Sequence, residues 1–470
     1  MTVDYDVIVV GGGGAGMTAA LHAHEMGASV IIVEADGKLG GATALSSGVV
    51  YAAQTEIQRA AGIDDTPNAM FDYIMTLNQW SLRPSMVRIL CEGSGPAVDW
   101  LAGLGTDFPT DWLARSGVDT VKRGHPANGS GAAIAQVLAN AVGVAGIETA
   151  LGSRVEAFIV EDGAVRGIKV EGAELRAHAV VLTSGGFGNN PELIKRLYPT
   201  AAAHGDRVFS VYFEVPYNMG DGILLGESVG AHVTGINTGL LNPSTGFGKF
   251  VEAFVPFWTM LVNLEGRRFM RETLPYSVSG YLMNEQRDGR TFAIFDEPTL
   301  QTFAGDTKSL SPYKSSVGSP TWFEPMIRQK LREGVVKSAP TLSALAEQIG
   351  INAETLQATT ERYNRDCLAG VDTEYGKTGP ALPPIIQAPF YAVEVRASLI
   401  GSGHAGLDIT EQCQVLDRNN RTIDGLYAAG EVACAVLGRR YAGGGISLAN
   451  AFVFGAIAGR EAAGARPTAS

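Results

Sequence analysis

An α/β fold interrupted by an inserted α+β domain is predicted by three features of this sequence. Near the N-terminus, an apolar strand-like run, a glycine cluster, a helical stretch and a second strand follow one another, as in a βαβ unit. From about residue 238 to residue 388 the pattern changes, because aromatic residues cluster and charged residues become more frequent. The last section returns to a hairpin, an apolar strand and a long helix. We therefore predict one domain made of residues 1–237 and 389–470, with residues 238–388 inserted as a cap.

The composition of the 470 residues indicates a globular protein, with 46% hydrophobic and 18% charged residues. A net charge of −12 without long basic runs argues against nucleic-acid binding. No uncharged apolar stretch approaches the ~18–20 residues of a membrane span. The four cysteines show no C-x-x-C spacing, and no charged leader precedes the first strand. We therefore expect no metal site, no membrane span and a cytoplasmic location.

The stretch "DYDVIVVGGGGAGMTAALHAHEMGASVIIVEA" carries the strongest local signal. Its G-x-G-x-x-G spacing predicts a tight turn, a close approach of a pyrophosphate to bare backbone, and close packing of the helix on the strand. The start of the helix would face the phosphates. Glu34 ends the second strand at the spacing of a carboxylate that binds a ribose hydroxyl, and it favours FAD or NAD over NADP. The predicted contacts of the loop are Gly11, Gly13, Gly14, Ala15 and Gly16.

A second cluster of small residues, "KLGGATALSSGVVYAA", follows directly and shifts the prediction to FAD. It could wrap the ribityl chain and the edge of the flavin with hydroxyl groups, whereas NAD has no need of it. The first domain is therefore predicted to be a Rossmann-like FAD-binding domain. The contacts expected from this cluster are Gly41, Ala42, Thr43, Ser46, Ser47 and Gly48.

Residues 153–190 read as a β-meander with turns at "EDG" and "EGA". Its last strand, "AVVLTSGGF", is apolar and ends on glycines, so we expect it to return to the first sheet and to bring Gly185 near the cofactor. Another glycine-flanked helix start, "MGDGILLGESVGA", places Asp221 at its tip.

Several motifs in their order resemble the flavoprotein family of fumarate reductases, succinate dehydrogenase flavoprotein subunits and 3-ketosteroid 1-dehydrogenases. The motifs are "VVGGGGAGMTAAL", "GGATALSSG", "LTSGGF", "MGDGI", "VNLEGRRFMRE", "ERYN", "DGLYAAGE" and "GGISLANAFVFGAIAG". The resemblance implies FAD contacts at the residues above and also at Glu431, Ser447 and Leu448. Because residues 40–48 contain no histidine of the kind that attaches flavin covalently in some members, it implies non-covalent FAD. A helix beginning near Ile446 would point its positive end at the reduced flavin, which is anionic.

Two tyrosines favour the ketosteroid dehydrogenase branch of this family. Fumarate reductases carry arginines at the positions of Tyr276 and Tyr441, where they bind a dicarboxylate, so fumarate is an unexpected substrate here. By resemblance, the Tyr441 hydroxyl and the Gly445 N–H would hold the carbonyl of a cyclic ketone. Tyr276 would remove the proton alpha to it, and hydride from the beta carbon would pass to flavin N5. Because a phenol in water ionises near pH 10, we expect an alkaline activity optimum.

The size of the ketone stays open at this point. Ketosteroid dehydrogenases have a further active-site tyrosine in the N-terminal third, and residues 106–135 contain none. A smaller oxocyclohexane is therefore an alternative to a 3-ketosteroid. A second alternative is an enone or enoate reductase that runs the reverse chemistry, and a third is a flavin-binding electron-transfer subunit. For the dehydrogenase, a quinone, oxygen or a redox protein would serve as the external electron acceptor, whereas the reductase would be fed by a separate electron donor.

Overall fold

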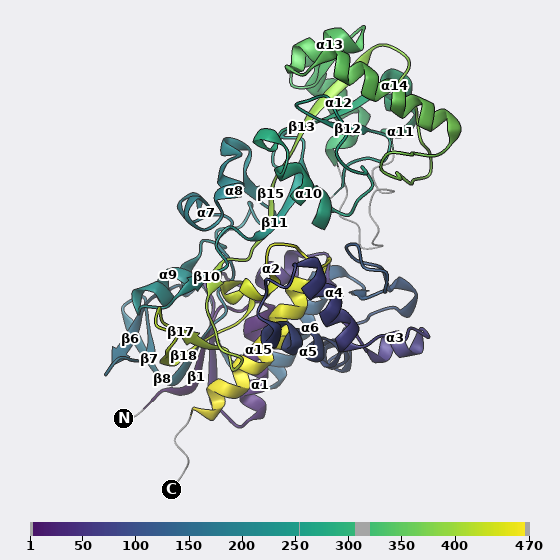
Figure 1. Ribbon diagram of the computed structural model, residues 1–470. Coiled ribbons are helices and arrows are strands. Elements are labelled where there is room, and N and C mark those ends of the chain that lie inside the picture. Colours follow the sequence, from purple (N-terminus) through teal and green to yellow (C-terminus); the bar gives the residue numbers. More distant parts are fainter. Residues whose placement is uncertain (1–2, 253, 306–319, 466–470) are drawn as a thin grey trace. The chain divides into compact units, whose positions relative to one another are not determined.

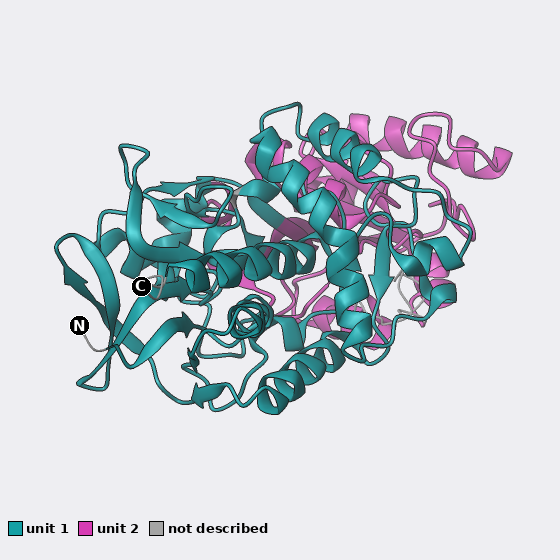
Figure 2. Cartoon of the chain, turned by 90° about the horizontal axis from the view of Figure 1, so that it is seen from below, with its two compact units in different colours: residues 1–199, 212–240, 402–470 teal, residues 200–211, 241–401 magenta. Residues whose placement is uncertain are grey.

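The computed structural model describes residues 3–252, 254–305 and 320–465. The chain forms two compact units (Figure 2). Unit 1 contains residues 1–199, 212–240 and 402–470, and unit 2 contains residues 200–211 and 241–401.

Unit 1 is built on a sheet in which β1 (Tyr5–Val10) lies between β2 (Val30–Val33) and β8 (Ala173–Leu182), and both pairings are parallel. Figure 1 labels β1 beside β8. The full path runs β17-β18-β8-β1-β2-β5. The predicted return of the meander to the first sheet is confirmed, because Val10 pairs with Leu182. The other strands of this sheet are β5 (Glu148–Ala150), β6 (Val155–Glu161), β7 (Ala164–Val170), β17 (Gln414–Leu416) and β18 (Thr422–Ala428).

Two helices cross closely beside this sheet, α1 (Gly14–Glu25) and α15 (Ile446–Gly464). Glycines on α15 permit the approach, since a Cβ at Gly459 would lie 2.1 Å from the Ala19 carbonyl oxygen. The N-terminal and C-terminal parts of the chain thus form one layer of the cofactor-binding unit. The longer helices around them are α4 (Pro67–Leu77), α5 (Pro84–Gly103), α6 (Ser130–Val144) and α9 (Asp221–Ser228). Short elements of unit 1 are α2 (Gly41–Leu45), α3 (Glu56–Ala60), α7 (Pro191–Leu197), β3 (Val49–Tyr51), β4 (Gly124–Pro126), β10 (Val233–Thr234) and β16 (Gly406–Leu407).

Unit 2 is an α+β unit whose sheet centres on the long strand β15 (Phe390–Gly403). This strand pairs antiparallel with β13 (Thr291–Asp296) and β14 (Lys337–Ala339), and parallel with β9 (Phe209–Ser210). The remaining strands are β11 (Gly239–Ser244) and β12 (Met260–Asn263). The helices are α10 (Tyr276–Asn284), α11 (Glu297–Phe303), α12 (Glu324–Arg332), α13 (Leu342–Ile349) and α14 (Ala353–Ala369). Buried side chains of β12, β13, α13 and α14 form one apolar core.

The chain between residues 342 and 369 forms two helices that are separated by a short break. Gly350 ends α13 in the left-handed conformation at φ +70°, and the Asn352 side chain accepts a hydrogen bond of 2.7 Å from Thr355 N to cap α14.

The compact units differ from the predicted domain ranges in three places, the smallest being residues 238–240, which lie in unit 1 rather than in the cap. Residues 389–401 lie in unit 2, because β15 pairs there with β13 and β14. Residues 200–211 also lie in unit 2, because Phe209 pairs with Leu399. The domain ranges themselves stay a prediction.

Candidate cofactor and active site

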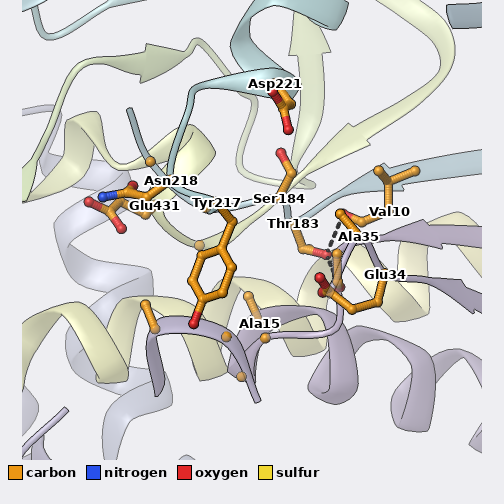
Figure 3. A pocket seen from close by; sticks show the side chains of 18 of the residues that line it. Val10, Ala15, Glu34, Ala35, Thr183, Ser184, Tyr217, Asn218, Asp221 and Glu431 are labelled. Carbon is orange, nitrogen blue, oxygen red and sulfur yellow. Dashed lines mark hydrogen bonds between the residues drawn. The ribbon is translucent and has the colours of Figure 1, made fainter. Parts of the chain in front are cut away.

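A cavity of about 1100 Å³ opens in unit 1 at the carboxyl ends of β1, β2 and β8. Such an edge of a parallel sheet is where α/β proteins bind ligands. Thirteen of the seventeen residues predicted to bind the cofactor line this cavity. They are Gly11, Gly13, Gly14, Ala15, Glu34, Gly41, Ala42, Thr43, Gly185, Asp221, Glu431, Ser447 and Leu448. Figure 3 labels four of them, Ala15, Glu34, Asp221 and Glu431.

The three motif glycines have distinct environments. Gly11 has φ +104°, and a Cβ there would lie 2.6 Å from the Thr183 carbonyl oxygen. A Cβ at Gly16 would lie 1.8 Å from the Gly11 carbonyl oxygen, so only glycine lets α1 follow β1 so closely. A Cβ at Gly13 would meet no atom within 4 Å. Gly13 therefore presents bare backbone to open space in the cavity, as a pyrophosphate needs.

The start of α1 also fits an anionic group. Its N-cap residue Gly13 provides no side-chain hydrogen bond, and Gly14 N donates to Thr43 Oγ1 at 3.2 Å. The remaining first-turn amides and the positive end of the helix dipole are available to phosphate oxygens.

Glu34 lies at the end of β2 with its carboxylate fixed by backbone. Gly12 N donates to one carboxylate oxygen at 2.5 Å, and Asp36 N donates to the other at 2.7 Å. Each oxygen retains a further lone pair for a ribose hydroxyl. This geometry fits the predicted ribose contact.

Two further polar side chains that line the cavity could form hydrogen bonds to a ligand. The Ser184 hydroxyl is buried and has no hydrogen-bond partner among the described residues. Glu431 receives the Gly403 N–H at 3.3 Å, and burial raises the pKa of its carboxyl to about 7. A neutral carboxyl can donate as well as accept a hydrogen bond, which suits the hydroxyls and ring heteroatoms of FAD.

The other four predicted cofactor residues lie outside the lining. Gly16 packs α1 on β1, as described above. Ser46 accepts Gly131 N on its carbonyl oxygen at 3.1 Å, and a Cβ at Gly131 would lie 2.0 Å from the Thr43 carbonyl oxygen. Ser46, Ser47 and Gly48 thus continue from α2 into a close packing against α6, and do not line the cavity with their side chains.

Sequence reasoning missed several side chains that line the cavity, among them Arg154, Tyr212 and Tyr217. Arg154 forms an ion pair of 2.7 Å with Asp221, so it fixes a predicted cofactor residue. Burial raises the pKa of Tyr212, which stays protonated. The aromatic run just before "MGDGI" was the available signal for the two tyrosines.

The segment that carries Tyr441 and Gly445 is held by hydrogen bonds to its backbone. Tyr73 Oη donates to the Ala442 carbonyl at 2.7 Å, and Ser116 Oγ donates to the Gly444 carbonyl at 3.0 Å. Gly445 has φ +101° and is the N-cap of α15, which begins at Ile446 as expected. Its bare Cα is required, because a Cβ would lie 2.7 Å from the Val49 carbonyl oxygen.

The Tyr441 ring stacks on a neutral imidazole. Its hydroxyl lies 3.1 Å from Ser447 Oγ, and the ring centroid is 5.9 Å from that of His404. Burial lowers the pKa of His404 to about 4. His404 Nδ1 lies 2.6 Å from the Gly438 carbonyl and so donates, which leaves Nε2 to accept from Ser402 Oγ at 2.9 Å. These contacts hold the His404 ring in place beside Tyr441.

Tyr276 belongs to unit 2, where it is the first residue of α10. It is half-buried, and its ring meets Phe254 edge to face at 5.8 Å. Arg268, also in unit 2, forms an ion pair with Glu272 at 2.9 Å and another with Asp372 at 2.8 Å.

Two general absences apply to the described residues alone. Among them, no helix is long and apolar enough to cross a membrane, and no group of three or more His, Cys, Asp or Glu could hold a metal ion.

Nearly the whole chain is similar to known proteins. The family described as "FAD binding domain" matches residues 6–448. A fumarate reductase (cytochrome) of Shewanella frigidimarina is 31% identical, over 97% of this chain and 77% of that protein. A 3-oxosteroid 1-dehydrogenase of Mycolicibacterium smegmatis is 26% identical, over 98% of this chain and 97% of that protein. The structure of a 3-ketosteroid-Δ4-(5α)-dehydrogenase from Rhodococcus jostii RHA1 has a TM-score of 0.78 and 26% identity, covering 98% of each chain.

Proposed function

From the premise that the chain belongs to the FAD binding domain family, and is an FAD-dependent oxidoreductase, we propose that it introduces a carbon–carbon double bond beside the carbonyl of a cyclic ketone. The predicted family and the predicted cofactor FAD are confirmed, and covalent attachment is not indicated. The ketone, the direction of the reaction and the electron acceptor belong to the proposal.

The observation that carries the proposal is the arrangement of Tyr441 and Gly445 at the N-terminal end of α15. The Tyr441 hydroxyl is fixed by Ser447, and the bare N-cap Gly445 lies where the helix presents its positive end. Two fixed donors of this kind stabilise the negative charge that develops on a carbonyl oxygen when the alpha proton leaves. An arginine at position 441, which a dicarboxylate would require, is absent.

In the proposed reaction the ionised phenolate of Tyr276 takes the alpha proton and becomes a neutral phenol, while the Tyr441 hydroxyl and the Gly445 N–H hold the carbonyl oxygen. FAD supplies the hydride acceptor when it is bound. The similarity to a 3-oxosteroid 1-dehydrogenase supports a ring ketone as substrate.

The experiment follows flavin absorbance when the FAD-loaded enzyme is mixed anaerobically with ketosteroids and oxocyclohexanes of graded size. We expect bleaching by one size class. Tyr276→Phe should abolish bleaching while FAD stays bound, and Tyr441→Phe should slow it about 10²–10³-fold. Tyr281→Phe, farther along α10, serves as the matched control and should bleach at the wild-type rate. Bleaching of Tyr276→Phe at the wild-type rate would remove it as the base.

The second candidate is a reductase that runs the same chemistry backwards, favoured by the similarity to a fumarate reductase. It predicts that an enone or enoate re-oxidises the pre-reduced enzyme, while saturated ketones bleach little flavin. The same anaerobic mixing therefore decides between the two directions.

A further inference from the structure

Three arginines of unit 2 converge on one carboxylate, and the proposed reaction uses none of them. Glu394 on β15 accepts from Arg290 Nε at 2.7 Å, from Arg396 Nη2 at 2.7 Å and from Arg396 Nε at 2.9 Å. All three of these hydrogen bonds fall on one oxygen, Oε1. The other oxygen, Oε2, lies 3.4 Å from Arg207 Nη1. We call Arg207, Arg290 and Arg396 the arginine triad.

The charges of this cluster do not balance. Three guanidinium groups and one carboxylate leave a net charge of +2, in a chain whose net charge is −12. Burial lowers the pKa of Arg207, and the like charges of Arg396 and Arg290 lower it further. Glu252 is the other carboxyl that acts on Arg207, but burial raises its pKa to about 7, so it is only partly ionised at neutral pH. The triad therefore carries uncompensated positive charge.

Hydrogen-bond donors are also left over. Arg207 Nη2 donates to the carbonyls of Ser244 and Glu394 at 3.4 and 3.1 Å, while its Nε is buried without a hydrogen-bond partner among the described residues. The triad side chains are 19–35% exposed, so a small ligand can reach them. Bare backbone also adjoins the triad, since a Cβ at Gly246 would lie 2.6 Å from Arg207 Nη2.

Another arginine network of unit 2 provides the contrast. Glu374 lies 3.8 Å from Arg268 at the edge of a cluster in which Arg268 and Lys377 face Glu272 and Asp372, so no positive charge is left unpaired. Apart from Glu374, these side chains are almost completely buried. The side chains of that network are buried and their positive charges are paired, so it offers no site for a ligand. The side chains of the arginine triad are partly exposed, and their positive charge exceeds the negative charge of Glu394.

We propose that the arginine triad binds a small oxyanion with two negative charges, of the phosphate or dicarboxylate type. Guanidinium groups bind such oxygens in pairs, and a dianion matches the excess charge of +2. Glu394 holds the three arginines in place and also competes with the ligand for their donors. The proposed reaction uses none of these four residues, and none of them lines the FAD cavity.

The test uses the full chain loaded with FAD, so that phosphate cannot occupy the pyrophosphate region of the cofactor cavity. Inorganic phosphate is titrated by calorimetry, with potassium chloride at matched ionic strength as the reference. We expect saturable phosphate binding, about tenfold weaker in Arg396→Gln and in Arg290→Lys. Glu394→Gln should bind phosphate several-fold more tightly, because the competing carboxylate is gone. Arg421→Gln, at an exposed turn of unit 1, should bind like the wild type.

The opposite sign of the two kinds of substitution keeps the proposal testable even if one variant folds poorly. Equal phosphate affinity in the wild type, Arg290→Lys and Glu394→Gln would overturn the site. A second titration with malonate distinguishes the two sources of the anion, since tighter binding of malonate than of phosphate assigns a dicarboxylate. Saturable binding of neither anion would also overturn the proposal.

Discussion

The site in unit 1 is shaped mainly by backbone atoms, whereas the sites in unit 2 are formed by charged side chains. Around the cofactor cavity of unit 1, backbone decides the geometry, since Gly11, Gly13 and Gly16 each leave space that a side chain would close. In unit 2 the features that stand out are charged side chains, Arg268 in a closed network and Arg207 in an open one. The difference teaches where each unit is vulnerable. An added methyl group should damage unit 1, whereas a lost or gained charge should damage unit 2.

The largest effect is expected from Arg268→Met in unit 2. The substitution leaves Glu272 and Asp372 buried with Lys377 as their remaining cation, and breaking a buried ion pair costs about 3–5 kcal/mol. Urea unfolding of the FAD-loaded protein measures the loss. Arg421→Met, which removes an exposed pair with Asp417, should cost no more than about 1 kcal/mol. Equal losses in the two variants would contradict the distinction between closed and exposed pairs.

A pH effect of somewhat smaller size is expected from Glu252, which is fully buried in unit 2. Burial raises the pKa of its carboxyl to about 7, although Thr321 and Thr245 donate hydrogen bonds to it. Because the folded pKa is raised, its contribution to stability is complete below about pH 4.5 and is lost as the pH rises through 7.

Glu252→Gln removes this titration. The free energy of unfolding of the variant, relative to wild type, should therefore rise by roughly 3 kcal/mol between pH 4.5 and pH 8. Urea unfolding at a series of pH values gives this difference. A constant difference across the range would show that the carboxyl titrates as it does in water.

The smallest change, one methyl group, tests the backbone-built site of unit 1. In Gly16→Ala the new Cβ would stand 1.8 Å from the Gly11 carbonyl, so α1 must shift away from β1. We expect a loss of about 1–3 kcal/mol and a clear drop in bound FAD, measured as the flavin-to-protein absorbance ratio. Gly103→Ala at the end of α5, where a Cβ meets no atom within 4 Å, should retain FAD and stability. Full FAD content in Gly16→Ala would show that α1 yields without harm.

The parts of the site that the sequence predicts are those whose signal is local. The strand, glycine loop, helix and Glu34 lie within 30 residues, and their spacing alone brings them to one edge of the sheet. The supports of Tyr441 were not predictable in this way. Tyr73 reaches the Ala442 carbonyl across 369 positions of sequence, and a tyrosine that binds a distant backbone carbonyl leaves no periodic trace.

Ser46 and Ser47 show a different reason for a missed placement. Hydroxyl groups beside glycines suit a ligand, but they also suit the close packing of two helices, and here they follow α2 where it meets α6. Composition cannot separate these uses, because both require small polar residues. Only the path of the α6 backbone, near Gly131, decides between them.

The imidazole of His404, which stacks on Tyr441, limits how the activity can depend on pH. With a pKa of about 4, His404 keeps the same charge at every pH at which the folded protein would be assayed. An acidic limb near pH 6 in a rate profile would therefore belong to another group, and replacing His404 should not move it. The imidazole stacked on the Tyr441 ring should therefore contribute no ionisation of its own to the activity profile.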